Sequence, residues 1–489
     1  MDSKVVYKST FHKTNSLYLV LSALFIYLML YQFHGFQVFG GDTLETIPYA
    51  LWMNDSSLFA NDFQLSQLHT SSINERIVSA FLLHLFGDNI EWGSRILHFI
   101  FTFILCAGLI RFADLIIKHF TLSVVIVFIT LFPLYHINIG GNELYYNMFI
   151  PSLAAKAAGI WAFVFAYSKR YFLTGVMLGF TTLFHPLVGL QLFVILLPIV
   201  FYLNGFKKES FFFAGSFVLT GGIFLLFLLG AQGPNVEASA TFYEIVKFRS
   251  AHHFIPAFFT KSHNISLSAL YILSIALYVR KNKFLALFFG LAGAGIILYF
   301  LGVSLKMDHI LASQFIKINI WLKFFAVIGI IAFIKSMLEQ KQLNLLSIIL
   351  FILTLIISLT RFNPVYDSDY PLDIYTWVQI HTDANDIFLL PPELSDFKAR
   401  TKRSTYFDFK STLYHKSAIF HWYNRFQEVY GMEAEGRTTH MDLFKEVNRH
   451  YLKGEEWKSG AIDYVITRNN QKIPERELVF SDGNFKIFK

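Results

Sequence analysis

Long apolar runs dominate the pattern of this chain, and short polar segments separate them. About eleven of these runs have the length and composition needed to cross a hydrocarbon core of roughly 30 Å as helices. They are Leu17–Phe33, Ser94–Phe112, Leu122–Ile139, Leu153–Ser168, Tyr171–Phe184, Leu187–Leu203, Phe211–Ala231, Ile265–Arg280, Phe284–Gly302, Ile320–Lys335 and Leu345–Thr360. The pattern therefore predicts a polytopic, mostly α-helical membrane protein.

The fifth and sixth runs meet at His185-Pro186. Proline lacks the backbone N–H and clashes with the preceding turn, so one unbroken helix is excluded there. The sequence predicts either a tight hairpin or a kink at this point.

Lysine and arginine recur in every second segment between the runs. These basic residues are Lys4, Lys8, Lys13, Arg111, Lys118, Lys169, Arg170, Lys207, Lys208, Arg280, Lys281, Lys283, Lys335 and Lys341. The positive-inside rule places that side in the cytoplasm, and an odd number of spans then places everything after Thr360 outside. No small-residue cleavage site follows the first run, which suits a retained signal anchor.

The exterior segments are much longer than the cytoplasmic ones. They are Gly35–Gly93, Gly140–Ser152, Gln232–Asn264, Val303–Asn319 and the tail. We expect a transmembrane domain over residues 1–360, with its first exterior loop at 34–93, and a soluble exterior domain over residues 361–489.

The tail contains short runs typical of strands, at Ile387–Leu390, Tyr464–Thr467, Glu477–Phe480 and Phe485–Phe488. Ser481-Asp482-Gly483 between the last two is a hairpin turn signal. The tail is predicted to form a small α/β or α+β domain.

Composition agrees with the membrane assignment. Of 489 residues, 54% are hydrophobic and only 15% are charged, which is more apolar side chain than one soluble core can bury. The net charge of +7 resides in clusters between the runs, so membrane orientation explains it better than nucleic-acid binding does. Cys106, the single cysteine, lies inside an apolar run and excludes an intrachain disulfide framework.

The first exterior loop carries the strongest candidates for chemistry. Asp42 follows the first run closely, so its carboxylate could meet a lipid-linked substrate at headgroup depth. There it could act as a general base, or hold a divalent cation together with Glu45 or Asp62. The alternative is structural: Asp42 could cap a helix whose third residue is Glu45. Asp55 is interpreted as a turn residue.

Two later exterior segments carry cations. Arg249, His252 and His253 stand beside aromatic residues and could bind a phosphate, although such aromatics also anchor helices at an interface without any ligand. Lys317 precedes the tenth run and could hold a lipid phosphate, or its ammonium could simply reach the headgroup layer.

Lys156 lies inside the fourth run, where an isolated charge is costly. We expect a partner or a wet cavity there, with Glu143 as the candidate partner. His185 could line the same cavity, while a helix-breaking turn also accounts for it.

Several short patterns resemble a known group of proteins. Phe184-His185-Pro186, Arg249-x-x-His252-His253-x-x-Pro256 and the tail pattern from Phe397 to Lys410 are similar to poorly characterised bacterial multi-span proteins. Their layout, with an acid-bearing first exterior loop, many spans and a C-terminal exterior domain, resembles the GT-C class of integral membrane glycosyltransferases.

The resemblance implies inverting transfer of a sugar from a polyprenyl-phosphate donor to a glycan, lipid or protein acceptor of the cell envelope, at the exterior face of a bacterial cytoplasmic (inner) membrane. Asp42 maps onto the usual base. Thr43 follows it, so Glu45 and Asp62 compete for the second acidic role, and participation of Mg²⁺ or Mn²⁺ stays open. The resemblance maps the basic residues near the lipid phosphate onto Lys317 and Arg249. From the residues themselves, His252, His253 and His185 are further candidate ligands of that phosphate.

Other functions share part of this pattern. A polysaccharide polymerase or ligase would use the same kind of lipid-linked substrate but join preassembled chains. A solute transporter or lipid flippase would also need many spans, but intramembrane charges are few and no repeated half is visible. A noncatalytic scaffold for envelope assembly is the third alternative.

Overall fold

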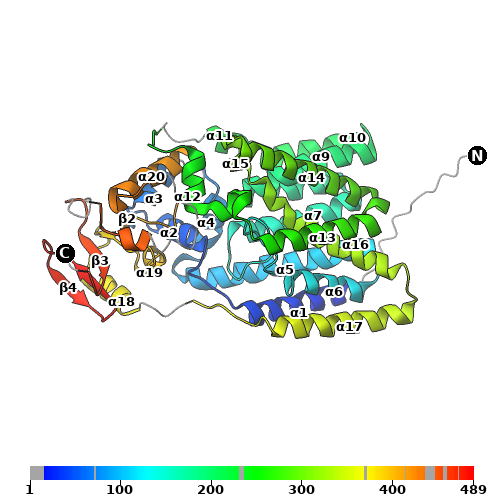
Figure 1. Cartoon of the computed structure of the whole chain (residues 1–489), viewed down its shortest axis with the longest axis horizontal. Helices are drawn as coiled ribbons and strands as arrows, with labels where there is room; N and C mark the ends of the chain where they lie inside the picture. Colours follow the sequence, from blue (N-terminus) through cyan, green and yellow to red (C-terminus); the bar gives the residue numbers. More distant parts are fainter. Residues whose placement is uncertain are drawn as a thin grey trace, which may run out of the picture.

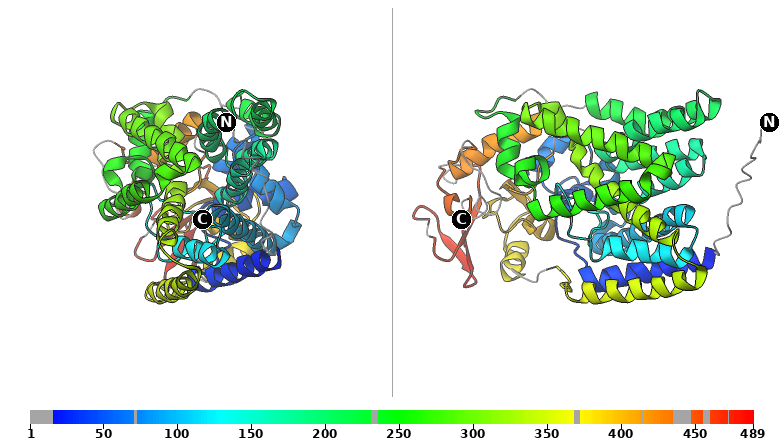
Figure 2. Two further views of the ribbon diagram at one scale, coloured as in Figure 1. Left: turned by 90° about the vertical axis from the view of Figure 1, so that its right-hand side faces the viewer. Right: turned by 45° about the vertical axis from the view of Figure 1, so that its right-hand side comes forward.

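The computed structural model describes residues 16–70, 73–230, 236–367, 372–413, 415–434, 447–454, 460–471 and 473–489. A helical bundle occupies one end of the molecule and a smaller part with a β-sheet occupies the other (Figure 1). The first helix begins at the end of the bundle remote from the sheet, and Figure 2 shows the same separation from a second direction. Lys4, Lys8 and Lys13 lie outside the described residues.

Seven helical stretches in the described part of the chain are long and apolar enough to cross a membrane. They are α1 (Ser16–His34), η1 (Gly87–Asn89) with α5 (Ile90–Ile117), α9 (Pro186–Asn204), α10 (Lys208–Phe217) with η2 (Val218–Gly222) and α11 (Ile223–Gly230), α14 (Lys283–Ser304), α15 (Asp308–Ser313) with η5 (Phe315–Ile318) and α16 (Asn319–Lys335), and α17 (Gln340–Leu359). This pattern agrees with a multi-pass membrane protein.

The remaining predicted runs form shorter helices. These are α6 (Phe120–Leu131), α7 (Pro151–Tyr167), α8 (Tyr171–Phe184) and α13 (Lys261–Leu277), the last followed by η4 (Val279–Lys281). All eleven runs are therefore at least partly helical, while seven stretches reach full spanning length where about eleven spans were expected. The mostly α-helical class is confirmed, and the number of crossings stays a prediction.

Burial separates the centre of the bundle from its surface. Trp321 and Phe325 of α16 are almost inaccessible, whereas α17 exposes Ile349 and Ile356. Exposed aliphatic side chains of this kind suit contact with lipid rather than water.

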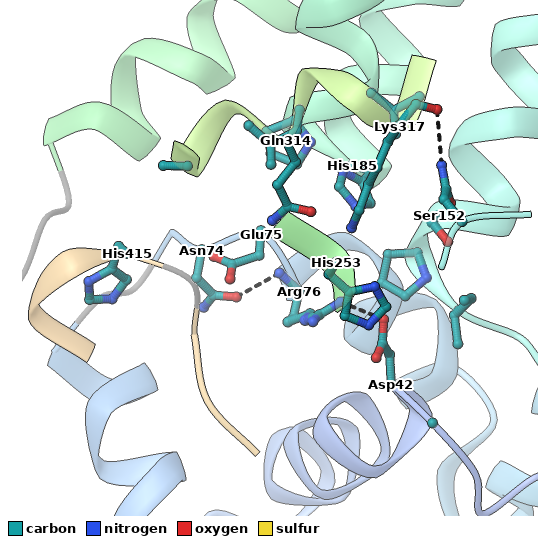
Figure 3. Close-up of a pocket in the computed structure, with 18 of the residues that line it drawn as sticks. Asp42, Asn74, Glu75, Arg76, Ser152, His185, His253, Gln314, Lys317 and His415 are labelled. Carbon is teal, nitrogen blue, oxygen red and sulfur yellow. Dashed lines mark hydrogen bonds and ion pairs between the residues drawn. The ribbon is translucent and has the colours of Figure 1, made fainter. Parts of the chain in front are cut away.

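The His185-Pro186 junction is a tight hairpin rather than a kink. Helix α8 ends at Phe184, α9 starts at Pro186, and the two helices pack against each other. Proline at the first helical position costs no hydrogen bond, because a backbone N–H at this position would have no partner within the helix. The hairpin places His185 close to Lys317 of η5 (Figure 3).

Between α1 and α5 the predicted first loop folds into three helices, α2 (Thr43–Asn54), α3 (Phe63–Thr70) and α4 (Ile77–His84). The segment after α11 contributes α12 (Phe242–Phe254) and η3 (Pro256–Phe258). The tail adds α18 (Leu372–His381), α19 (Phe397–Thr401) and α20 (Lys416–Tyr430). We call these segments, together with the sheet, the polar domain.

The sheet has five strands in the order β2-β1-β3-β5-β4. They are β1 (Ile387–Leu389), β2 (Ser404–Phe407), β3 (Tyr464–Arg468), β4 (Leu478–Ser481) and β5 (Phe485–Phe488). Strand β1 pairs in parallel with β2 and β3, while β5 pairs antiparallel with β3 and β4. The predicted strands and the β4–β5 hairpin are confirmed, and β2 is an additional strand.

The polar domain shares one hydrophobic cluster across its segments. Phe248 of α12, Phe407 of β2 and Trp422 of α20 are buried in it together with Tyr299 from the end of α14. The tail therefore packs on the earlier loops and on the end of the bundle, rather than standing apart from them.

The charge inside α7 has partners, as expected. The Lys156 ammonium donates to the backbone carbonyl of Glu143 and, at 2.8 Å, to Asn142 Oδ1. The Glu143 carboxylate is paired with Lys323 of α16 at 2.9 Å. Burial of both lysines is thus matched by fixed acceptors.

Candidate functional site

A cavity of about 410 Å³ lies where the bundle meets the polar domain. Its walls come from segments far apart in the chain, and the close-up in Figure 3 shows them converging. The polar groups that line it include Asp42, Asn74, Glu75, Arg76, Asn142, Tyr146, Ser152, His185, His253, Gln314, Lys317, Lys410 and His415. Three of the predicted ligands and the predicted base are among them.

Asp42 stands at the N-cap position of α2, but its side chain makes no capping hydrogen bond. Its Oδ1 lies 3.6 Å from Lys410 Nζ, and its Oδ2 lies 3.9 Å from Arg76 Nη1. The side chain is 40% exposed. The prediction that the Asp42 side chain caps a helix is therefore wrong. Its carboxylate faces the cavity and not the helix backbone.

The charge state of Asp42 follows from its neighbours. Burial raises the pKa of this carboxyl, but Lys410, Arg76 and Lys317 outweigh burial and hold the pKa below its usual range. Asp42 is thus an anion at neutral pH, placed among cations.

Glu45 does not reach the cavity as a free acid. Its Oε2 lies 2.5 Å from Nη2 of Arg76, and both side chains are buried. Burial raises the pKa of Glu45 and the Asp42 charge adds to that, while Arg76 opposes both. Arg76 consequently lies between two acids, and Glu45 serves to hold it there.

Lys317 and His185 approach from the bundle side. Figure 3 shows both side chains directed toward Asp42, Lys317 from η5 and His185 from the α8–α9 hairpin. Asn142 Nδ2 donates to the Lys317 carbonyl at 3.3 Å, which ties this segment to the loop before α7. Both residues line the cavity together with Asp42, and their role as ligands of a lipid phosphate stays a prediction.

His253 lines the cavity from α12, and its Nδ1 lies 2.9 Å from the Gly140 carbonyl. Burial, Lys317 and His252 all keep the pKa of His253 well below its usual value, so its ring is neutral at pH 7. Gly141 makes this approach possible, because a Cβ there would stand 2.6 Å from His253 Cε1 and its φ is +63°. His252 packs against His253 at 3.9 Å between ring centroids, but is not a lining residue.

The structure does not bring Asp62 and Arg249 to the cavity. Asp62 is fully buried, 3.1 Å from Lys398 Nζ and 2.9 Å from both the N and Oγ1 of Thr405. Arg249 donates to the Lys410 carbonyl at 2.5 Å. Neither is a lining residue, so a direct catalytic or phosphate-binding role does not suit either one.

The cavity contains functional groups that sequence reasoning missed. Arg76 and Lys410 both face Asp42, and Gln314 points into the space beside them. A buried acid such as Glu45 requires a cation, but the sequence does not say which one. Lys410 lies 368 positions from Asp42 by the printed numbering, so no spacing rule connects them.

One wall of the cavity is apolar. Leu187 and Val188 contribute from α9, and Leu228 and Leu229 from α11. Leu229 is also 65% exposed, so it belongs to the outer surface of the bundle as well. The cavity thus has charged residues around Asp42 and an aliphatic wall that reaches the exposed apolar surface of the bundle.

The charges around Asp42 do not fit a divalent cation. No group of three or more His, Cys, Asp or Glu side chains in the described ranges is arranged to hold a metal. Asp42 and Glu45 are already neutralised by Arg76 and Lys410, and these cations would repel Mg²⁺ or Mn²⁺.

Comparison with known proteins adds one match. Residues 371–429 match a family described as a domain of unknown function (DUF6798). This segment includes β1, β2, most of α20 and the cavity residues Lys410 and His415. No curated protein matches the chain. The matched segment thus contributes two lining residues, Lys410 and His415, to the cavity that holds Asp42.

Proposed function

We propose that this protein is an inverting membrane glycosyltransferase that takes a sugar from a polyprenyl-phosphate donor. One observation carries the proposal: an aspartate paired with cations lies in a cavity that has an aliphatic wall continuous with the bundle surface. A lipid-linked sugar phosphate presents the matching groups, namely an anion, a polar sugar and an apolar chain.

The donor phosphate would pair with Lys317 and Arg76. The neutral His253 ring donates its Nδ1–H to the Gly140 carbonyl, so its Nε2 would accept a hydrogen bond from a hydroxyl of the donor sugar. Cations placed where negative charge accumulates stabilise the departing phosphate. The apolar chain would follow Leu228 and Leu229 toward the surface of the bundle. His185, also a lining residue, stands beside Lys317 and would contact the same end of the donor.

Asp42 would act on the acceptor. Its carboxylate takes the proton of an acceptor hydroxyl, the hydroxyl oxygen bonds to the anomeric carbon, and the bond from that carbon to the phosphate oxygen breaks. Attack from the face opposite the phosphate inverts the anomeric centre, and polyprenyl phosphate leaves with the electron pair.

A carboxylate with a depressed pKa is a weak base, and efficient proton transfer needs a pKa nearer the working pH. Donor binding would raise the pKa of Asp42, because the donor phosphate neutralises part of the positive charge of Lys317 and Arg76. The pKa of Asp42 then rises when the donor is in place. Base strength and donor occupancy are coupled in this arrangement.

The proposed setting is the exterior face of a bacterial inner membrane, with the N-terminus in the cytoplasm and the polar domain outside. Nucleotide sugars are not expected there, so a lipid carrier is the suitable donor. The acceptor would be a glycan, lipid or protein of the cell envelope.

Asp42→Asn tests the role of the base. In lipid nanodiscs with a radiolabelled polyprenyl-phosphate sugar and envelope lipids as acceptors, we expect the wild-type protein to transfer label and the variant to lose about 100-fold or more of the rate. Asp55→Asn is the matched control, because Asp55 is an exposed turn acid hydrogen-bonded to Ser57. Transfer by a folded Asp42→Asn protein at the wild-type rate would contradict the assignment.

A further inference from the structure

A turn held by several hydrogen bonds carries Lys410, whose ammonium lies 3.6 Å from Asp42 Oδ1. Asp408 Oδ1 accepts hydrogen bonds from the backbone N–H groups of Lys410, at 2.8 Å, and Ser411, at 3.2 Å. Asp408 Oδ2 accepts from Ser411 Oγ at 2.6 Å. A carboxylate that accepts hydrogen bonds from the backbone N–H groups two and three residues later fixes the backbone of the turn. The Lys410 side chain therefore leaves the backbone from a defined position.

The other side of this turn is held by α12 and α20. Arg249 donates to the Lys410 carbonyl at 2.5 Å, and its guanidinium stacks 5.0 Å from the Trp422 ring centroid. Trp422 Nε1 in turn donates to the Asp408 carbonyl at 3.3 Å. Arg249 and Trp422 are both buried, so the turn is fixed from two directions.

A buried ion cluster connects the turn to the first loop. Lys398 Nζ lies 3.7 Å from Asp408 Oδ2 and 3.1 Å from Asp62 Oδ1, and donates to Gln64 Oε1 at 2.8 Å. Lys398 is 1% exposed and Asp62 is fully buried. Removing one charge from such a cluster leaves the others without compensation, so its geometry is strongly coupled.

We infer that Asp62, Lys398, Asp408 and Arg249 are positioning residues for Lys410, and that Lys410 is the cation by which the C-terminal segment pairs with Asp42. The inference explains two residues, Asp62 and Arg249, that the sequence marked as functional and that do not line the cavity. It also assigns a task to the DUF6798 segment, which contributes Lys398, Asp408 and Lys410. The segment completes the charge environment of an acid on a distant loop.

Other charged and titratable groups also face Asp42. They come from the first loop, the bundle and α12, and comprise Glu45, Arg76, Tyr146, Lys156, His185, His253 and Lys317. Lys410 has the largest lowering effect on the Asp42 pKa among its neighbours. Its removal is therefore expected to be measurable while these groups remain.

The test measures protonation of Asp42 without any substrate. Dicyclohexylcarbodiimide reacts with protonated carboxyl groups in apolar surroundings, so the pH of half-maximal labelling of the Asp42 peptide, followed by mass spectrometry, reports its titration. The full-length protein in nanodiscs without donor lipid is used. This readout is independent of glycosyl transfer, so its failure and failure of the proposed function are distinguishable.

Lys410→Met is expected to raise the half-labelling pH by about one unit or more, because an opposite charge at this range lowers a carboxyl pKa by about 1–3 units. Lys402→Met is the control, since Lys402 is exposed to a similar extent, 45% against 40%, and its ion pair is with Asp88. An unchanged half-labelling pH in folded Lys410→Met protein would overturn the inference.

Asp62→Asn tests the positioning step. We expect it to raise the half-labelling pH of Asp42 in the same direction, although Asp62 does not contact Asp42. In the double variant Asp62→Asn/Lys410→Met the increase should not exceed that of Lys410→Met alone, since Asp62 acts through Lys410. Additive increases, or no effect of Asp62→Asn in a protein that melts normally, would refute the positioning role.

Discussion

Arg76 shows how one side chain defines the chemistry of the cavity. Its two terminal nitrogens face different acids, Nη2 toward Glu45 and Nη1 toward Asp42. The planar guanidinium suits this double contact, which a lysine could not reproduce. Glu45 fixes the arginine, and the arginine then acts on Asp42.

Arg76→Gln should destabilise the protein strongly, because Glu45 would remain buried without a counter-ion. Breaking a buried pair typically costs about 3–5 kcal/mol. The matched control is Arg468→Gln, since Arg468 also pairs with a glutamate, Glu393, at 2.5 Å but is 51% exposed. An exposed pair contributes about 0–1 kcal/mol.

Thermal unfolding in nanodiscs, monitored for both variants, measures the difference. The melting temperature of Arg76→Gln should fall well below that of Arg468→Gln. Equal melting temperatures would mean that burial of the Glu45–Arg76 pair does not matter to stability.

At the scale of elements, short loops between helices determine which side chains meet. The turn at Gly140-Gly141 has positive φ at both residues and carries the chain close to α12. Only a residue without Cβ allows the His253 ring to pack on this turn. The loop before α7 thereby positions a histidine that belongs to another element.

Gly141→Ala should displace His253 and weaken binding of a polyprenyl-phosphate sugar, measured with a fluorescent analogue in nanodiscs. Gly87→Ala is the control, because Gly87 also has positive φ, +55°, but a Cβ there meets nothing within 4 Å. Both variants incur a backbone cost of about 1 kcal/mol, and only Gly141→Ala adds a steric clash. Equal binding by the two variants would show that the His253 position is irrelevant to the ligand.

At the scale of the whole molecule, charge and apolarity are distributed along one axis. The polar domain covers one end of the bundle (Figure 1). The bundle exposes aliphatic side chains, and residues of both parts line the cavity. Such a layout suits a reaction at the membrane surface, where a lipid carrier and a polar acceptor can both reach the cavity.

Orientation can be tested with single cysteines. In a Cys106→Ala background, Lys402→Cys in the polar domain should react with a membrane-impermeant thiol reagent in intact cells. Lys207→Cys at the start of α10, at the opposite end of the bundle, should react only after permeabilisation. Cys106 is buried, so its removal affects no surface thiol. The reverse labelling pattern would place the polar domain in the cytoplasm and contradict the proposed exterior reaction.

The pattern of apolar runs by itself determined the coarse architecture. Period and length of hydrophobic segments are local properties, so the helices, the His185-Pro186 break and the strands near Ile387, Tyr464 and Phe485 could be located from sequence. The acid just beyond α1, Asp42, also stood out in the sequence, and its side chain lines the cavity.

Which charges share the cavity depends on how the elements pack in three dimensions. Arg76 and Lys410 join Asp42 through contacts between distant segments, and Asp62 turns inward to Lys398, because ion pairing depends on distance in space rather than separation in sequence. Local patterns fix which residues form helices and strands. The packing of those elements fixes which acid remains exposed to a ligand and which becomes part of the scaffold.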